Sequence, residues 1–303
     1  MVPAKGTQMK PAPFAYLAPQ SLAEALTIMD QHGDDARLLA GGQSLIPVMN
    51  FRLAQPALLV DLNGVAELAQ CAADESGGLG IGAMVRHSQL EHSQTIARLA
   101  PLLHETMPYI AHPQIRNRGT IGGSLAHADP AAELPVVTVA LQARFRLQRA
   151  GGERWVAAQD FYQELFTTAV QPQEILTEVA IPPLPPRTGW AFLEVARRHG
   201  DYAQAGVAVL ISLDEAGVCQ QARLVYLNVG EIPMRAPKAA ALLVGEVPSP
   251  SLLAAIAHTA AQSEIDPTSD VQGTAVYKRH LAHVLGQRAL QQAIARAQAA
   301  LTA

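Results

Sequence analysis

The sequence predicts an α+β protein of two domains, and three observations support this prediction. The chain has 303 residues, of which 49% are hydrophobic, so it can bury a large core and form more than one domain. Strand-like and helix-like segments alternate through the first half, which favours an α/β arrangement there. Beyond a proline-rich stretch at 181–186, two strand-like runs precede helices rich in Ala, Leu and Gln, which predicts an antiparallel sheet packed with helices.

The first elements follow from capping boxes and short apolar runs. Residues 21–24 (Ser-Leu-Ala-Glu) form a capping box, and apolar residues then recur at helical spacing until Gly33. A second capping box at 88–91 (Ser-Gln-Leu-Glu) predicts a helix that continues towards Leu103. Short strands bounded by Gly, Asn or charged residues are expected at 37–40, 58–62 and 79–85.

The middle of the chain predicts a pair of strands and then a domain junction. The strands are expected at 138–147 and 155–156, joined across 150–153, with a helical turn at 160–166 after them. The proline-rich stretch continues neither a helix nor a central strand, because proline lacks an amide hydrogen. We therefore expect domains at 1–180, itself split near residue 60, and at 181–303.

The C-terminal domain begins with a predicted hairpin. Strands at 206–213 and 222–229 flank the turn sequence Asp-Glu-Ala-Gly at 214–217. Helices are expected at 252–262 and 278–300, the second with an apolar stripe along one face.

Charge and cysteine content exclude several function classes. A net charge of −4 with scattered Lys and Arg residues argues against a nucleic-acid partner. Cys71 and Cys219 are the only cysteines, so a disulfide framework or an iron–sulfur site cannot be built from this chain alone. Neither a signal peptide nor an apolar run of spanning length is visible, so we expect a soluble, cytoplasmic protein.

Two similar glycine loops are the main functional clue. They are residues 40–45 (Ala-Gly-Gly-Gln-Ser-Leu) and 120–125 (Thr-Ile-Gly-Gly-Ser-Leu), each entered from an apolar or β-branched run. Paired glycines bring backbone amides close to a ligand, and successive amides beside a serine suit a diphosphate. Neither loop has the spacing of a Walker or Rossmann motif. The alternative interpretation is that each loop is only a tight turn.

The sequence around these loops resembles a known family. Residues 114–135 (Gln-Ile-Arg-Asn-Arg-Gly-Thr-Ile-Gly-Gly-Ser-Leu-Ala-His-Ala-Asp-Pro-Ala-Ala-Glu-Leu-Pro) are similar to the FAD-binding signature in the medium subunits of molybdenum hydroxylases. Residues 39–49 resemble that family's first FAD loop, and 197–203 (Arg-Arg-His-Gly-Asp-Tyr-Ala) its C-terminal motif. The resemblance runs from about residue 11 to 290. The family includes carbon monoxide and xanthine dehydrogenases and hydroxylases of nicotine, quinoline and caffeine.

The resemblance implies a fold, a cofactor and a set of site residues. The fold would be a two-part FAD-binding domain of the vanillyl alcohol oxidase and MurB (PCMH) type at 1–180, followed by a smaller α+β domain. Two sets of residues would bind the FAD diphosphate, Asp129 the adenosine side and Glu133 the FAD, and Tyr202 would lie against the isoalloxazine ring. The diphosphate sets are Ala40, Gly41, Gly42, Gln43, Ser44 and Leu45 in the first loop and Thr120, Gly122, Gly123 and Ser124 in the second.

The resemblance also implies partners. A large subunit with a molybdenum–pterin cofactor would hydroxylate the substrate, and a small subunit with two [2Fe–2S] clusters would pass the electrons to FAD in this chain, within a dimer of heterotrimers. No catalytic residue or metal ligand is then expected in this chain. The substrate stays open, as does the final acceptor, which could be NAD, a quinone, a cytochrome or oxygen.

Nearby polar residues are assigned structural roles. Arg116 and Arg118 could neutralise a diphosphate, but surface ion pairs are the preferred interpretation. His112, His127 and His199 fit no metal pattern. Glu194 stands where related subunits often carry a lysine, and its carboxylate would disfavour an anionic reduced flavin.

Two rival functions remain at this stage. A stand-alone flavin oxidase or dehydrogenase of the same fold would need its own substrate pocket, and the residues after the proline-rich stretch are too few and too rich in alanine for a dedicated cap lined with catalytic Tyr, Arg and His. A non-enzymatic module whose C-terminal helices dock a partner would carry no flavin. The visible spectrum of the purified chain separates the second rival from the main hypothesis.

Overall fold

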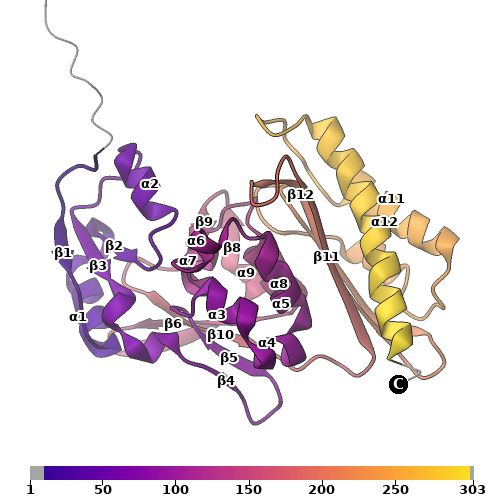
Figure 1. The fold of residues 1–303 in the computed structure, drawn as a ribbon, viewed down its shortest axis with the longest axis horizontal. Helices are drawn as coiled ribbons and strands as arrows, with labels where there is room; N and C mark the ends of the chain where they lie inside the picture. Colours follow the sequence, from indigo (N-terminus) through magenta and orange to yellow (C-terminus); the bar gives the residue numbers. More distant parts are fainter. Residues whose placement is uncertain (1–9, 301–303) are drawn as a thin grey trace, which may run out of the picture.

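The N-terminal unit is a small parallel sheet covered by helix α1 (Figure 1). The computed structural model describes residues 10–300, so the ends of the two predicted domains, at 1–9 and 301–303, lie outside the described residues. The strands pair in the order β1-β3-β2, and both pairings are parallel. The elements are β1 (Ala15–Leu17), α1 (Leu22–His32), β2 (Ala36–Leu39), α2 (Leu45–Asn50) and β3 (Leu58–Asp61).

The central unit is an antiparallel sheet with helices packed against it. Its five strands run in the order β4-β5-β10-β6-β7, so β10, late in the sequence, lies in the middle. The strands are β4 (Cys71–Ala73), β5 (Leu79–Gly82), β6 (Arg144–Arg149), β7 (Gly152–Ala157) and β10 (Ile175–Ile181), with a separate hairpin of β8 (Tyr162–Glu164) and β9 (Thr167–Thr168). The helices are α3 (His87–His92), α4 (Gln94–Leu99), α5 (Pro101–Thr106), α6 (Pro113–Arg116), α7 (Ile121–His127), α8 (Glu133–Ala140) and α9 (Ala158–Phe161).

The C-terminal unit is an antiparallel sheet between two layers of helices. Residues of β12 are buried along its whole length, and they alternate between a core shared with α5 and α8 and a core shared with α11 and α12. This double burial explains the nearly continuous apolar run in β12. The elements are β11 (Thr188–Ala196), β12 (Ala203–Leu213), β13 (Cys219–Leu227), β14 (Met234–Arg235), α10 (Pro237–Ala241), α11 (Pro250–Ser263) and α12 (Ala275–Ala299). No helix within residues 10–300 has the length and apolar character needed to cross a bilayer.

Most predicted elements are confirmed, including the hairpin at 214–217 and the cap at Ser21, whose side chain accepts a hydrogen bond from the amide of Glu24. The strand predicted from Thr138 is wrong in its first part, because residues 133–140 form helix α8. All eight residues of α8 are buried, so tertiary packing overrides the strand preference of its β-branched residues.

Two helix predictions are also wrong. The helix expected from Ser88 begins instead with Arg86 as N-cap, whose amide donates to Gln89 Oε1 at 2.8 Å. It does not continue to Leu103, because Ser93 caps a new helix and Pro101 starts a third. The helical turn expected at 160–166 is largely the β8–β9 hairpin, since α9 ends at Phe161.

Candidate cofactor-binding site

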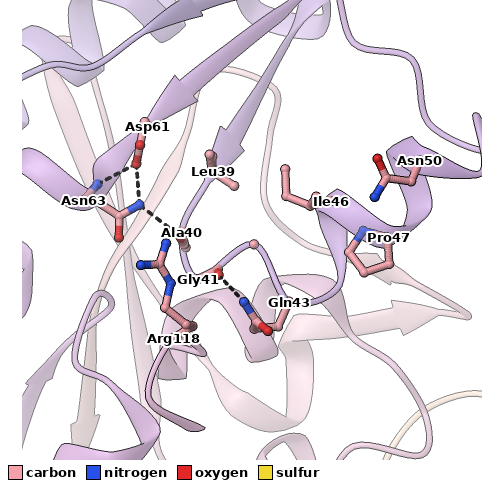
Figure 2. A pocket seen from close by; sticks show the side chains of 11 residues that line it. Leu39, Ala40, Gly41, Gln43, Ile46, Pro47, Asn50, Asp61, Asn63 and Arg118 are labelled. Atoms are coloured by element: carbon pink, nitrogen blue, oxygen red, sulfur yellow. Dashed lines mark hydrogen bonds between the residues drawn. The ribbon is translucent and has the colours of Figure 1, made fainter. Parts of the chain in front are cut away.

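The first glycine loop borders a cavity at the edge of the N-terminal sheet. The loop leaves β2, turns at Gly42 with φ +72°, and enters α2. The cavity has a volume of about 320 Å³, and Figure 2 shows the side chains around it. It is lined by Leu39, Ala40, Gly41, Gly42, Gln43, Ile46, Pro47, Asn50, Asp61, Asn63 and Arg118.

The backbone of this loop offers unused hydrogen-bond donors. Within residues 10–300, the amide N–H groups of 41–44 donate to no other group of the protein. The side chain of Gln43 folds back and donates from Nε2 to the carbonyl of Gly41 at 2.9 Å (Figure 2). Successive free amides form a concavity that favours an anion. The first loop therefore has the donors that a diphosphate requires.

Arg118 adds a positive charge to the same cavity. It lies on its wall, is exposed, and makes no ion pair among the described residues. Arg116 differs, because its buried guanidinium holds both carboxylate oxygens of Glu91 at 2.7 and 2.9 Å. The ion pair predicted for Arg116 is confirmed, although it is buried and not at the surface as expected, whereas the ion pair expected for Arg118 does not form.

The two glycine loops touch each other. A Cβ atom at Gly41 would overlap the carbonyl oxygen of Arg118 and would lie 2.7 Å from Cα of Gly119. A Cβ atom at Gly123 would lie 3.3 Å from Cβ of Ala40. Glycine is therefore needed at residue 41 for a close approach of two backbones. Segments about 80 positions apart in the sequence meet beside one cavity.

The second loop has a different local role from the first. Thr120 caps α7 and accepts the amide of Gly123 through Oγ1 at 3.1 Å, and the amide of Gly122 donates to the carbonyl of Ala83 at 2.9 Å. A Cβ atom at Gly122 would meet that carbonyl oxygen at 2.8 Å. The amides of Gly122 and Gly123 already donate within the protein. The unpaired amide donors that were expected in both loops therefore occur in the first loop and not at the second glycine pair. The second loop supplies close packing, and Thr120, Gly122, Gly123 and Ser124 do not line the cavity itself.

The third motif packs against the segment that leads into the second loop. Residues 197–203 connect β11 to β12, and Gly200 has φ +87°. A Cβ atom there would lie 2.7 Å from Nδ1 of His112 and 2.8 Å from the carbonyl oxygen of Ala111. His112 is the N-cap of α6, which ends two residues before Arg118. The third motif therefore packs on the segment just before the second motif, while the first and second motifs are in direct contact.

Asp129, Glu133, Glu194 and Tyr202 form an acidic cluster apart from the cavity. Burial, reinforced by the charge of Asp129, raises the pKa of Glu133 to about 7. Burial and the neighbouring Glu133 raise the pKa of Glu194 to about 8. Partial desolvation and, after it, the charges of Asp129 and Glu133 raise the pKa of Tyr202. Tyr202 is nevertheless 60% exposed. Glu194 is therefore mostly protonated at pH 7, so the negative charge expected there is largely absent.

Some cavity residues were missed by sequence reasoning. Asp61 ends β3 and Asn63 follows it, and the Asn63 side chain donates to the carbonyl of Ala40 at 3.0 Å. Their position had a detectable signal, because β2 and β3 were both predicted and parallel strands place their carboxyl ends at one edge, where ligands bind. Ile46 and Pro47 lie within the motif at 39–49 but were not named as site residues, because helix α2 was not predicted, and Asn50 lies outside the motif. Ser44 and Leu45, which were predicted, lie at the start of α2 outside the cavity lining.

The raised pKa of Glu194 gives a stability prediction. A carboxyl with a higher pKa when folded contributes stability below its unfolded pKa of about 4.5, and this stability is lost as the pH rises towards 8. Glu194→Gln should therefore have a larger free energy of unfolding than the parent at pH 8, by on the order of 1–3 kcal/mol, and so a higher unfolding temperature, with little difference at pH 5. Thermal unfolding at both pH values measures this.

Glu164→Gln is the matched control, because Glu164 is exposed on β8. It should leave the pH dependence of unfolding unchanged. An E194Q variant that gains no stability between pH 5 and pH 8 would show that Glu194 is ionised at neutral pH.

Family comparisons agree with this architecture. The profile described as FAD binding domain in molybdopterin dehydrogenase matches residues 12–184, and that of the CO dehydrogenase flavoprotein C-terminal domain matches 190–293. The 6-hydroxypseudooxynicotine dehydrogenase complex subunit alpha of Paenarthrobacter nicotinovorans is 44% identical, over 95% of this chain and 97% of that protein. The carbon monoxide dehydrogenase medium chain of Afipia carboxidovorans is 40% identical, over 95% of this chain and 99% of that protein.

Solved structures show the same fold. A structure of carbon monoxide dehydrogenase from Hydrogenophaga pseudoflava has a chain that superposes with a TM-score of 0.91 at 38% identity, covering 94% of this chain and 99% of that chain. Quinoline 2-oxidoreductase from Pseudomonas putida 86 gives 0.90 at 38% identity, covering 96% and 99%. The resemblance inferred from the motifs is thereby confirmed. The chain belongs to the molybdopterin dehydrogenase flavoprotein family, with an FAD-binding domain followed by a CO dehydrogenase flavoprotein C-terminal domain.

Proposed function

We propose that this chain is the FAD-carrying subunit of a molybdenum hydroxylase, which accepts electrons from a partner and delivers them to an external acceptor. The observation that carries the proposal is the cavity where two glycine loops meet, with free amides at 41–44 and the cation of Arg118 beside them. This donor set fits a diphosphate without lysine. FAD, when bound, accepts electrons one at a time and releases them singly or in pairs.

Different residues of the chain are proposed to bind different parts of FAD. In the proposal, residues 40–45 hold the diphosphate, and Thr120, Gly122, Gly123 and Ser124 form the surface that closes against them. Asp129 lies in one cluster with Glu133 and Tyr202, so we assign it to the isoalloxazine end and not to the adenosine side that the resemblance implied. Glu133 would form a hydrogen bond with the cofactor, and the exposed ring of Tyr202 would pack on the isoalloxazine. A protonated Glu194 near Glu133 keeps this end of the site less negative than two ionised carboxylates would.

The finer assignments follow from the family. We propose the PCMH-type division of the FAD domain, with domains at 1–180 and 181–303 and a split near residue 60. The proposed partners are a large molybdopterin subunit and a small [2Fe–2S] subunit, in a dimer of heterotrimers. The complex names of relatives, such as the 6-hydroxypseudooxynicotine dehydrogenase complex, support a multi-subunit assembly. A cytoplasmic location stays a prediction of the sequence.

Arg118 is expected to matter for FAD affinity. Arg118→Gln removes the only arginine or lysine among the residues that line the cavity, so the FAD dissociation constant should rise about 10- to 100-fold, the range for losing one charge-assisted contact. Fluorescence titration of the apoprotein with FAD measures this. Arg98→Gln is the control, because Arg98 is an exposed residue of α4, and this variant should keep the FAD affinity of the parent. Equal affinities in both variants would exclude Arg118 from the site.

The proposed function is tested by expressing the chain with its genomic neighbours and purifying the complex. We expect one FAD per chain and flavin reduction on adding the substrate of the complex, with no reduction of the isolated chain. A colourless chain would contradict the proposal in favour of a docking module. Reduction of the isolated chain by a small organic substrate would favour the stand-alone oxidase.

A further inference from the structure

A buried lysine lies in the C-terminal domain, away from the diphosphate cavity. Lys278, at the end of the first turn of α12, is 1% exposed, and its Nζ donates to Asp270 Oδ2 at 2.7 Å and to Asn228 Oδ1 at 3.1 Å. An ammonium near a helix N-terminus opposes the helix dipole, and burying it carries a desolvation cost. Neither the helix nor the core therefore requires a cation at this position.

Asn228 connects the lysine to both segments that carry the acidic cluster and Tyr202. It follows β13 with φ +55°, and its backbone amide donates to the carbonyl of Pro130 at 2.9 Å. Its side-chain Nδ2 donates to the carbonyl of Ala203 at 2.5 Å. Pro130 is the neighbour of Asp129, and Ala203 is the neighbour of Tyr202. Asn228 thus fixes the two segments relative to each other.

Lys278 and the carbonyl of Ala203 together hold the orientation of the Asn228 side chain, one at each end of the amide. An ammonium can only donate hydrogen bonds, so it accepts only the oxygen of the amide as a partner. With Oδ1 directed to Lys278, Nδ2 must face the carbonyl of Ala203. Without the lysine, Oδ1 of Asn228 loses its donor, and the side chain is held only by the donations of Nδ2 to the carbonyls of Ala203 and Gln204.

Asp270 extends the same network to the far side of the motif loop. Its carboxylate accepts the amides of Gln272 at 2.8 Å and Gly273 at 3.0 Å, which holds the segment 270–273 in a turn. In this segment the carbonyl of Val271 accepts from Arg197 at 2.5 Å, and that of Gln272 accepts from the side chain of Gln204. Both ends of the 197–204 loop are therefore tied to the segment that Lys278 anchors.

We propose that Lys278 is a positioning residue for the flavin end of the site, acting through Asn228 and Asp270 on the segments at 129–130 and 202–203. The inference rests on the proposed FAD function, since Tyr202 and Glu133 act there only if the flavin lies against them. Removing the lysine changes none of the side chains proposed to contact FAD. It removes hydrogen bonds that hold the segments carrying those side chains. The expected consequence is a misaligned flavin in a folded protein.

The test compares Lys278→Met, which removes the ammonium, with Asn228→Asp, which keeps an acceptor for Lys278 but cannot donate to Ala203. Arg288→Met is the control, because Arg288 is exposed on the same helix. Three quantities are measured on the full chain: the FAD dissociation constant, the visible circular dichroism of the bound flavin, and the unfolding temperature without FAD. Both test variants should weaken FAD binding about tenfold and change the dichroism, whereas R288M should match the parent.

The possible outcomes separate this inference from the proposed function. If the parent chain binds no FAD, the proposed function fails. If the parent binds FAD and both folded variants keep its affinity and dichroism, the positioning role alone is overturned. Loss of folding in both variants would overturn it as well, because the network would then serve the fold. A folded N228D with altered dichroism supports it even if K278M does not fold.

Discussion

Replacement of Gly42 by Asp is expected to abolish FAD retention. A Cβ atom at Gly42 would lie 3.2 Å from side-chain atoms of Ile46 and Leu39, which line the cavity, so the new carboxylate would sit at the cavity wall near the free amides, where the diphosphate is proposed to bind. Two like charges about 4 Å apart cost roughly 4 kcal/mol near a protein surface, which corresponds to about a thousandfold loss of affinity. Aspartate tolerates the left-handed backbone at φ +72° better than most residues, so the fold should survive. Flavin absorbance of the purified variant measures the effect.

The chain offers a matched control for this variant. Gly77 also has a left-handed backbone, at φ +86°, and a Cβ atom there would meet nothing within 4 Å. Gly77→Asp adds the same charge and similar backbone strain at the turn between β4 and β5, without the side-chain contacts that a Cβ atom at Gly42 would make with Ile46 and Leu39. It should retain flavin. Stoichiometric FAD in G42D would contradict the proposed diphosphate site.

Replacement of Gly41 by Ala is expected to separate the two loops. The added methyl group would overlap the carbonyl oxygen of Arg118, and two backbones must move apart to admit it. Overpacking of this kind typically costs about 1–3 kcal/mol. The unfolding temperature should fall, and FAD should be lost because Arg118 and the free amides no longer share one cavity. Differential scanning calorimetry and FAD titration measure the two effects.

Gly152→Ala is the control for G41A, since a Cβ atom at Gly152 would meet only the side chain of Arg149, at 3.8 Å. Gly152 has no left-handed backbone, as is also true of Gly41. G152A should keep both the unfolding temperature and the FAD affinity of the parent. A G41A variant that behaves in the same way would show that the contact between the loops is unimportant.

The sequence predicted strands and helices best where one local signal dominated. The box at Ser21 and the hairpin turn at 214–217 are local, and both are confirmed. Helix α8 was missed because Val136, Val137 and Thr138 favour strands, while its complete burial is a tertiary effect that no local pattern contains. Strand β10 was missed for a related reason, since its place at the centre of a sheet depends on partners far away in the sequence.

The candidate site was only partly predictable. The glycine pairs marked both loops, but the sequence could not show that the amides at 122 and 123 are already engaged while those at 41–44 are free. It also gave Arg116 and Arg118 the same role, although burial against Glu91 separates them. The protonation of Glu194 depends on burial and on Glu133, a neighbour 61 positions away, and neither can be inferred from one sequence.

The most direct test of the account is a crystal structure of the chain with FAD bound. We expect the diphosphate to accept hydrogen bonds from backbone amides within 41–44 and to lie beside Arg118. The second glycine loop, at Gly123, should lie on the other side. FAD bound elsewhere, or a diphosphate that touches neither the first loop nor Arg118, would contradict the account.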